Sequence, residues 1–141
     1  MPLQKTYREE MLLLSRDCDM GGLWRPSAVL TAMQETAGTH SHNLGCGRET
    51  LVKDGIVWVL TRCEVRMDGE ARLGSRLSIE TFPMPLRRWF FPRYFVFRDE
   101  SGAQLGAAGT LWVLFDLEKR CMVAPGEVAK AIPCLLYTSD A

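Results

Sequence analysis

The first third of the chain shows two different patterns of hydrophobic and polar residues. Residues 6–16 (TYREEMLLLSR) are apolar in the middle and polar at both ends, which predicts a partly buried strand, with a helix as the alternative. Farther along, Pro26 suits the first position of a helix and Ser27 its first turn. A helical stripe follows and ends at the flexible residues 42–47 (HNLGCG). Its apolar members recur at spacings of three and four residues: Val29, Leu30, Met33 and Ala37.

From residue 56 onward the pattern becomes that of a β-sheet. Residues 56–67 (IVWVLTRCEVRM) begin as a continuous apolar run and then alternate between apolar and charged positions, as a half-buried strand does. The segment 87–99 is rich in aromatic residues, and its Pro92 predicts a bulge or an unpaired edge position because proline has no N–H to donate. This segment is one of four further expected strands, which turn-forming residues separate from one another. The four strands lie at 76–82, 87–99, 105–117 and 120–124.

These elements follow the order strand, long helix, then antiparallel strands joined by short turns. A single helix among so many strands must be wrapped by the sheet, because each has one apolar face to bury. The order therefore predicts an α+β protein with the hotdog fold, in which an antiparallel sheet wraps around one long central helix. At 141 residues and 47% hydrophobic composition, the chain is long enough for one compact domain.

Charge and cysteine content narrow the functional classes. Lys plus Arg and Asp plus Glu number 17 each, so the overall charge gives no argument for nucleic acid or an anionic membrane as a partner. The five cysteines form no C-x-x-C pair, which indicates neither a zinc ribbon nor a disulfide framework and favours the reducing cytoplasm. No apolar run approaches the roughly 18 residues that cross a bilayer, so we expect no membrane span.

The two histidines do not predict a metal site. His40 and His42 are two residues apart and point from different faces of a helix, unlike the i, i+4 pairs that bind one ion. We expect His40 to cap the helix end or to lie at an interface. No cysteine has a histidine at the spacing of a catalytic pair, so the sequence favours neither a thiol nucleophile nor a metal or other cofactor.

The last part of the chain has a different character. Residues 134–141 (CLLYTSDA) bear no clear relation to the preceding segment and resemble the translation of a sequencing adapter. We therefore expect the domain to comprise residues 1–133, and the natural sequence to continue beyond them.

Three segments carry a resemblance to a known family: 33–40 (MQETAGTH), 55–65 (GIVWVLTRCEV) and 109–128 (GTLWVLFDLEKRCMVAPGEV). In order and spacing they resemble the N-terminal half of acyl-acyl carrier protein (acyl-ACP) thioesterases, over residues from about Tyr7 to Ile132. The resemblance implies two hotdog repeats in one chain that release a fatty acid from ACP by thioester hydrolysis. It implies as partners the fatty acyl thioester, ACP and a second repeat, or a second copy of the chain where that repeat is absent.

The family's catalytic motif lies in its second repeat and reads approximately D-x-D-x-N-x-H-V-N-N. Laid on residues 16–30 (RDCDMGGLWRPSAVL), its two acidic positions match Asp17 and Asp19. Gly21 stands at the asparagine position and Leu23 at the histidine position. Thioester hydrolysis requires a group that activates the nucleophile and donors for the developing oxyanion, which these two side chains do not supply. We therefore expect a non-catalytic repeat, and an isolated chain that is weakly active or inactive.

Two carboxylates remain as catalytic candidates. Asp19 is the first, although a loop carboxylate that stabilises the helix N-terminus is the simpler interpretation. Glu35 is the second, because some single-repeat hotdog thioesterases place a catalytic carboxylate on the central helix. Within the resemblance, however, Glu35 belongs to the non-catalytic repeat, which favours a buried, hydrogen-bonded structural role.

Hydrophobic residues of the helix and strands are candidates for an acyl-binding pocket, and packing in the core is the alternative explanation for them. We expect these residues to serve in both roles, because an alkyl chain can replace core atoms at similar hydrophobic cost. The candidates are Leu30, Met33, Trp58, Leu60 and Trp112.

Four arginines form a local run of positive charge: Arg87, Arg88, Arg93 and Arg98. ACP is acidic, so a basic surface helps it to dock and steers the encounter. We therefore expect Arg87 and Arg88 to belong to a docking site for ACP, with a solvated strand end as the alternative.

Two other functions remain open. In the first, the chain is a complete thioesterase in which two copies pair, and Asp19 or Glu35 acts on an acyl-CoA or acyl-ACP substrate. In the second, it is a non-catalytic acyl-binding module. Nucleic acid is not expected as a partner, because no recognised motif for it occurs. A lone hotdog domain is also expected to leave a sheet edge uncovered, which predicts self-association.

Overall fold

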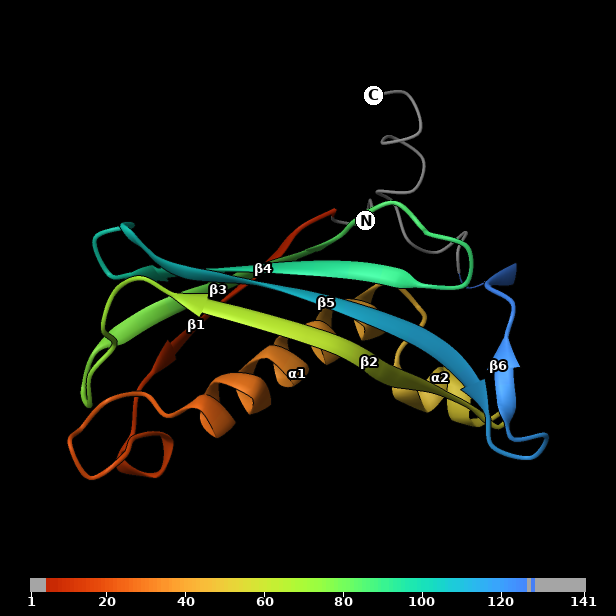
Figure 1. Cartoon of the computed structure of the whole chain (residues 1–141), viewed down its shortest axis with the longest axis horizontal. Helices are drawn as coiled ribbons and strands as arrows, with labels where there is room; N and C mark the ends of the chain where they lie inside the picture. Colours follow the sequence, from red (N-terminus) through yellow and green to blue (C-terminus); the bar gives the residue numbers. More distant parts are fainter. Residues whose placement is uncertain (1–4, 127, 129–141) are drawn as a thin grey trace.

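The computed structural model describes residues 5–126 and 128, and Figure 1 shows how they are arranged. The helices are α1 (Pro26–Asn43) and α2 (Arg48–Val52), and a short 3-10 helix lies at Ser15–Asp17. The strands are β1 (Tyr7–Leu12), β2 (Ile56–Met67), β3 (Arg76–Pro83), β4 (Phe91–Asp99), β5 (Gln104–Asp116) and β6 (Cys121–Val123).

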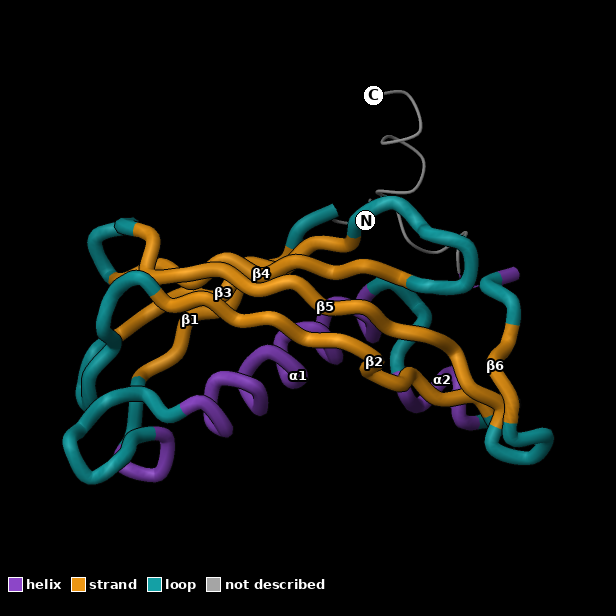
Figure 2. The backbone as a smooth tube through the Cα atoms, in the orientation of Figure 1, coloured by secondary structure: helices purple, strands orange, loops and turns teal. Residues whose placement is uncertain are grey.

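The strands form one antiparallel sheet in the order β1-β3-β4-β5-β2. β6 pairs with the end of β5, from Leu114 to Asp116, beyond the point where β4 stops. The sheet curves over α1, which lies along its inner face, as Figure 1 and Figure 2 show. An antiparallel sheet wrapped around one long helix is the hotdog fold, and the prediction from the order of elements is confirmed.

The helix and the sheet bury one hydrophobic cluster between them. On α1 the buried stripe runs through Val29, Met33 and Ala37 at intervals of four residues, which places these side chains on one face. On β3, Ile79 packs in the same cluster and is 1% exposed. The predicted stripe is therefore correct except for Leu30, which is 38% exposed.

A second hydrophobic cluster lies where α1 ends and α2 begins. Its buried members are Leu44, Cys46, Leu51, Phe91 and Leu114. The sequence pattern does not reveal α2, because five residues are too short to show a period. Gly47 precedes α2 at a close approach between the helices, where a Cβ atom would lie 2.8 Å from the Cα atom of His42. Trp58 and Trp112 are partly buried against this second cluster.

Three expectations about strands are wrong. The strand expected at 87–99 begins at Phe91, because residues 87–90 form a tight turn closed by the bridge between Arg87 and Phe90. The first strand ends at Leu12 and not at residue 16, because a 3-10 helix follows it.

The third expectation concerns Pro92, which lies inside the sheet, neither at an edge nor at the register shift of β4, which falls at residues 97–98. The Pro92 carbonyl oxygen accepts a hydrogen bond from Met84 N, just past the last regular pair of β3 and β4. Because the nitrogen and the carbonyl of one strand residue face the same neighbouring strand, the Pro92 nitrogen also faces this end of β3. The regular pairing has ended there, so the missing N–H is tolerated.

Two features concern the limits of the domain. Residues 134–141, for which we expect a foreign origin, lie outside the described residues. Within residues 5–126 and 128, no helix has the length and apolar character needed to cross a membrane.

Candidate functional site

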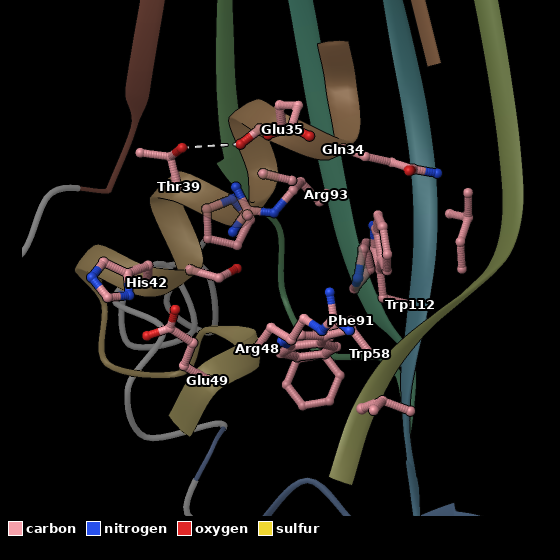
Figure 3. Close-up of a pocket in the computed structure, with 17 residues that line it drawn as sticks. Gln34, Glu35, Thr39, His42, Arg48, Glu49, Trp58, Phe91, Arg93 and Trp112 are labelled. Atoms are coloured by element: carbon pink, nitrogen blue, oxygen red, sulfur yellow. Dashed lines mark hydrogen bonds between the residues drawn. The ribbon is translucent and has the colours of Figure 1, made fainter. Parts of the chain in front are cut away.

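A cavity of about 810 Å³ lies beside α1, near its junction with α2. Residues of both helices and of β2, β4 and β5 line it, and Figure 3 shows their side chains. Its volume falls within the range of small-molecule sites, roughly 300–1,000 Å³. The residues of its walls therefore determine which ligand suits it.

One wall of the cavity is aromatic. Trp58 of β2, Phe91 of β4 and Trp112 of β5 line it, as Figure 3 shows. The rings of Trp58 and Phe91 meet edge to face, with their centroids 4.8 Å apart. Trp58 Nε1 donates a hydrogen bond to Cys46 O at 3.0 Å, and Trp112 Nε1 donates to Thr110 Oγ1 at 2.8 Å. The two indoles are thus held in place and present apolar surface to a ligand.

Polar residues form the exposed side of the cavity. Gln34 and Glu35 come from α1, while Arg48 and Glu49 come from the first turn of α2. All four are exposed to solvent. Figure 3 shows the Arg48 side chain extending from α2 toward the aromatic wall. The cavity therefore combines an aromatic wall with both signs of charge at its opening.

Arg93 is a charged residue on the buried part of the wall. It lies on β4 and is 6% exposed. Its Nη1 lies 2.9 Å from His40 Nδ1 and 3.1 Å from Thr81 Oγ1. His40 is 1% exposed and stacks on Tyr7, with ring centroids 5.8 Å apart. The expected capping or interface role of His40 is therefore wrong, because its ring lies in the core between α1 and the sheet.

The structure places some of the predicted acyl-pocket residues together and others apart. Trp58, Leu60 and Trp112 all border the cavity. Leu30 does not, and its side chain is 38% exposed on α1. Met33 is 2% exposed and packs in the cluster between α1 and the sheet. Leu30 and Met33 both come before Gln34, which is the first residue of α1 that borders the cavity.

Asp19 lies in the loop before α1 and does not border the cavity. Its Oδ1 accepts hydrogen bonds from Gly21 N at 2.8 Å and from Leu23 N at 3.0 Å. The carboxylate therefore stabilises its own loop. The expectation that it stabilises the helix N-terminus is wrong, because Arg25 is the N-cap residue of α1.

Glu35 borders the cavity from α1. Its side chain is exposed, so the expected buried, hydrogen-bonded role is wrong. The hydrogen bond drawn in Figure 3 uses its backbone, because Thr39 Oγ1 donates to the Glu35 carbonyl oxygen at 3.0 Å. The carboxylate itself is accessible to a ligand at the opening of the cavity.

The predicted run of arginines divides into different environments. Arg87 and Arg88 are exposed at the tip of the hairpin between β3 and β4. Arg93 does not join them, because successive strand residues alternate between the two faces and its side chain points to the helix side. Arg98 Nη1 pairs with Glu80 Oε1 at 2.9 Å. Of the four arginines, only Arg87 and Arg88 therefore form an exposed basic patch, which lies at the hairpin tip.

The four thiols among the described residues do not form a reactive or metal-binding group. Cys18, Cys46, Cys63 and Cys121 are free, and burial raises the pKa of the Cys46 and Cys63 thiols, which keeps them protonated. In the part of the chain that the structure describes, no three or more His, Cys, Asp or Glu side chains are placed to hold a metal ion.

Several residues of the cavity were not singled out by sequence reasoning, and two of them, Phe91 and Arg48, are central to its walls. Phe91 completes the aromatic wall, and its place in the alternation of β4 is the signal that identifies it. Arg48 lies on α2, which has no periodic pattern, so its position beside the cavity follows only from the fold.

Comparison with protein families identifies a match over nearly the whole chain. Residues 4–132 match the sequence profile of the acyl-ACP thioesterase N-terminal domain. No curated protein sequence matches the chain significantly.

Solved structures of thioesterases share the fold. An acyl-ACP thioesterase from Bacteroides thetaiotaomicron superposes with a TM-score of 0.82 at 24% identity, over 91% of this chain and 53% of that one. The 12:0-ACP thioesterase from Umbellularia californica gives 0.77 at 22% identity, over 89% and 50%. A 1,4-dihydroxy-2-naphthoyl-CoA thioesterase from Synechocystis gives 0.82 at 19% identity, over 94% and 98%. The chain thus spans about half the length of the first two proteins and nearly all of the third.

Proposed function

The chain belongs to the acyl-ACP thioesterase family, as its N-terminal domain, and we propose that it takes part in hydrolysing the thioester between a fatty acid and acyl carrier protein. In this proposal it holds the acyl chain beside an active site that it shares with a partner domain. Water adds to the thioester carbonyl, and the products are the fatty acid and the thiol of the carrier. The free cysteines fit the cytoplasm as the place of this reaction.

The aromatic cavity is the observation that carries this proposal. Trp58, Leu60 and Trp112 offer an alkyl chain an apolar wall. Each methylene that leaves water for such surroundings gains about 0.8 kcal/mol. The polar opening near Arg48 suits the hydrophilic arm that carries the thioester, which is the usual division of a ligand site into apolar walls and a few polar groups.

A second hotdog repeat is the partner that we propose for the open edge of the sheet. β2 is an edge strand, and its side chains Val59, Val65 and Met67 are exposed. A long edge strand with exposed apolar side chains pairs readily with another strand. We infer that the second repeat covers β2 from the same chain, or that a second copy does so where the repeat is absent.

The groups that activate water lie on the second repeat in this proposal. Asp19 is occupied by the amides of its own loop, at the other end of α1 from the cavity. Gly21 and Leu23 have no side chain that accepts a proton. The first repeat therefore positions the acyl chain, while its partner supplies the base and the oxyanion donors.

The hairpin tip is the proposed docking site for the carrier. Arg87 and Arg88 are exposed and belong to no ion pair among the described residues. An acidic carrier is attracted and oriented by such a patch. At the base of the hairpin, Leu86 packs against the cluster that includes Phe91 and Trp58, so a carrier bound here delivers its arm next to the cavity.

A second candidate function rests on Glu35. Its carboxylate is exposed at the opening of the cavity, on the central helix, and a carboxylate in that position can accept a proton from water. In this alternative, two copies of the chain pair and Glu35 catalyses the hydrolysis of acyl-CoA or acyl-ACP without a second repeat.

Thioester hydrolysis by the chain separates these functions. The first proposal predicts that the chain binds dodecanoyl-ACP with little or no turnover, and that Glu35→Gln and Asp19→Asn change neither property. Rapid turnover that Glu35→Gln abolishes and Asp19→Asn leaves intact would establish the self-sufficient enzyme. Failure to bind either dodecanoyl-ACP or dodecanoyl-CoA contradicts both. Binding without turnover even after the natural C-terminal half is joined would identify a non-catalytic acyl-binding module.

A further inference from the structure

A glycine stands in the interior of the central helix, where it weakens the helix. Gly38 lies within α1, which runs from Pro26 to Asn43 without interruption. Glycine at such a position is less favourable than alanine, because it loses more backbone freedom on folding. The formation of α1 therefore gives no reason for the absence of a side chain at position 38.

Neither backbone geometry nor close packing requires this glycine. Gly38 is not among the glycines with positive φ, so any residue can adopt its helical conformation. Apart from its chain neighbours and the nearby helix backbone, a Cβ atom at Gly38 would have no atom of the described residues within 4 Å. Gly47 shows the opposite case, because a Cβ atom there would lie 2.8 Å from His42 Cα.

Gly38 borders the cavity at the centre of its helical wall. Gln34 and His42, which lie four residues before and after it, also border the cavity. Helix positions four apart share a face, so the three residues form one row along the wall. From Gln34 to His42 this row is about 12 Å long, at 1.5 Å per residue. The missing side chain therefore widens the cavity halfway along α1.

The apolar walls of the cavity extend away from the end where Arg48 lies. Trp58 is fixed near that end by its hydrogen bond to Cys46 O, between α1 and α2. Leu60 lies two residues farther along β2, where it pairs with Trp112 of β5. A ligand that contacts Leu60 and Trp112 as well as Trp58 thus extends along the length of the cavity.

We propose that Gly38 determines how long an acyl chain the cavity accepts. Because this residue has no side chain, an alkyl chain that enters beside Arg48 continues past the middle of α1 to Leu60 and Trp112. A larger side chain at position 38 closes this passage and restricts the cavity to short chains. The inference rests on the proposed function, since the alkyl chain is that of its substrate, and it adds the residue that sets the preferred length.

Thr31 provides a matched control position on the same helix. It lies seven residues before Gly38, about two turns along the same face. It is exposed, and it does not border the cavity. Leucine is a good helix former, so neither Gly38→Leu nor Thr31→Leu should disturb α1. A difference in ligand binding between the two variants therefore reports on the cavity.

NMR titration of the chain with the hexyl and dodecyl thioethers of pantetheine tests the inference. We expect the unmodified chain to bind the dodecyl compound at least about tenfold more tightly, since each methylene that enters an apolar site adds about fourfold. Gly38→Leu should reduce this ratio to about threefold or less by weakening only the dodecyl complex. Thr31→Leu should retain the ratio of the unmodified chain.

Thermal unfolding of Gly38→Ala tests whether the fold itself requires the glycine. We expect Tm to rise by about 2–5 °C, because alanine is the better helix former and its methyl group meets no neighbouring atom. A fall in Tm would show that packing requires the glycine, and it would overturn the inference.

A ratio that Gly38→Leu leaves unchanged would overturn the inference while the proposed function stands, because the chain would still bind an acyl ligand. Equal affinities of the unmodified chain for the two compounds, or an equal loss in Thr31→Leu, would overturn it as well. Binding of neither compound to the unmodified chain contradicts both proposals. If Gly38→Leu does not fold, the Hα signals of Gly38 in the unmodified chain decide: they should shift with the dodecyl compound, and unchanged signals overturn the inference.

Discussion

Arg93 on β4 and His40 on α1 lie 2.9 Å apart, Nη1 to Nδ1, and this contact joins the sheet to the central helix. Because arginine only donates, the imidazole accepts at Nδ1 and carries its proton on Nε2. Tyr7 of β1 stacks on the same ring, with centroids 5.8 Å apart. Side chains from three elements thus pack together next to the cavity, with Arg93 and His40 buried and Tyr7 half-buried.

Loss of His40 should destabilise the domain far more than loss of His42. His40→Ala removes an acceptor of Arg93 and leaves a gap beside Tyr7, so we expect the free energy of unfolding to fall by about 2–4 kcal/mol. His42→Ala changes an exposed side chain and should stay within about 0.5 kcal/mol. Urea denaturation of the two variants measures the difference, and similar losses would show that the buried contact contributes nothing special.

Leu60 and Leu30 distinguish the observed cavity from the one that the sequence alone predicts. Leu60 borders the cavity and Leu30 does not. Leu60→Ala should weaken binding of a dodecyl pantetheine thioether by about three- to tenfold, because lost apolar contact lowers affinity. Leu30→Ala should leave the affinity unchanged. Fluorescence titration measures both, and a larger effect of Leu30→Ala would place the acyl chain elsewhere.

Asp99 gives the turn between β4 and β5 a pH-dependent stability. Hydrogen bonds from the Ser101 hydroxyl at 2.5 Å and from Ala103 N at 3.0 Å lower the pKa of its carboxyl. A lowered pKa stabilises the fold above the unfolded-state value of about 3.9, and this contribution is lost as the pH falls through the folded-state value. The stability advantage of the unmodified chain over Asp99→Asn should therefore shrink below about pH 4. Urea unfolding across this range measures it, and a difference independent of pH would refute the assignment.

Charge reversal at the hairpin tip should weaken docking of the carrier without affecting the cavity. We expect the double variant Arg87→Glu/Arg88→Glu to bind ACP about tenfold or more weakly at low salt, because an attractive patch becomes repulsive. Its affinity for an alkyl ligand without the carrier should be unchanged. The control Arg72→Glu/Arg76→Glu reverses two exposed charges at the other end of β3. Surface plasmon resonance compares the two, and equal weakening by the control would move the docking site away from the hairpin.

The order and type of the long elements were predictable because their patterns are long. α1 has a buried face that repeats over several turns, and Pro26 starts it where the sequence predicts. The pattern also placed Leu30 on the apolar stripe, since it falls three residues before Met33. In the structure Val29 is buried and Leu30 is not, because the positions of α1 that face the sheet are four residues apart, as Val29, Met33 and Ala37 are.

The site was less predictable, because side-chain environment depends on pairing between distant segments. Arg93 follows two arginines and thus has the sequence character of a basic run. Alternation along β4 puts it on the same face as Phe95 and Phe97, a signal that outweighs the local charge. Glu35 shows the reverse case, since an expectation of burial based on family resemblance did not account for the solvent-facing side of α1.

The indole N–H signals of the tryptophans test most directly whether the cavity is an acyl site. Trp58 and Trp112 line the cavity, Trp24 lies in the cluster between α1 and the sheet, and Trp89 is 43% exposed on the hairpin. The ¹⁵N-labelled chain is titrated with a dodecyl pantetheine thioether, which is not hydrolysed. We predict that the signals of Trp58 and Trp112 shift while those of Trp24 and Trp89 remain. Unchanged signals for Trp58 and Trp112, or a shift confined to the other two, would contradict the assignment of this cavity.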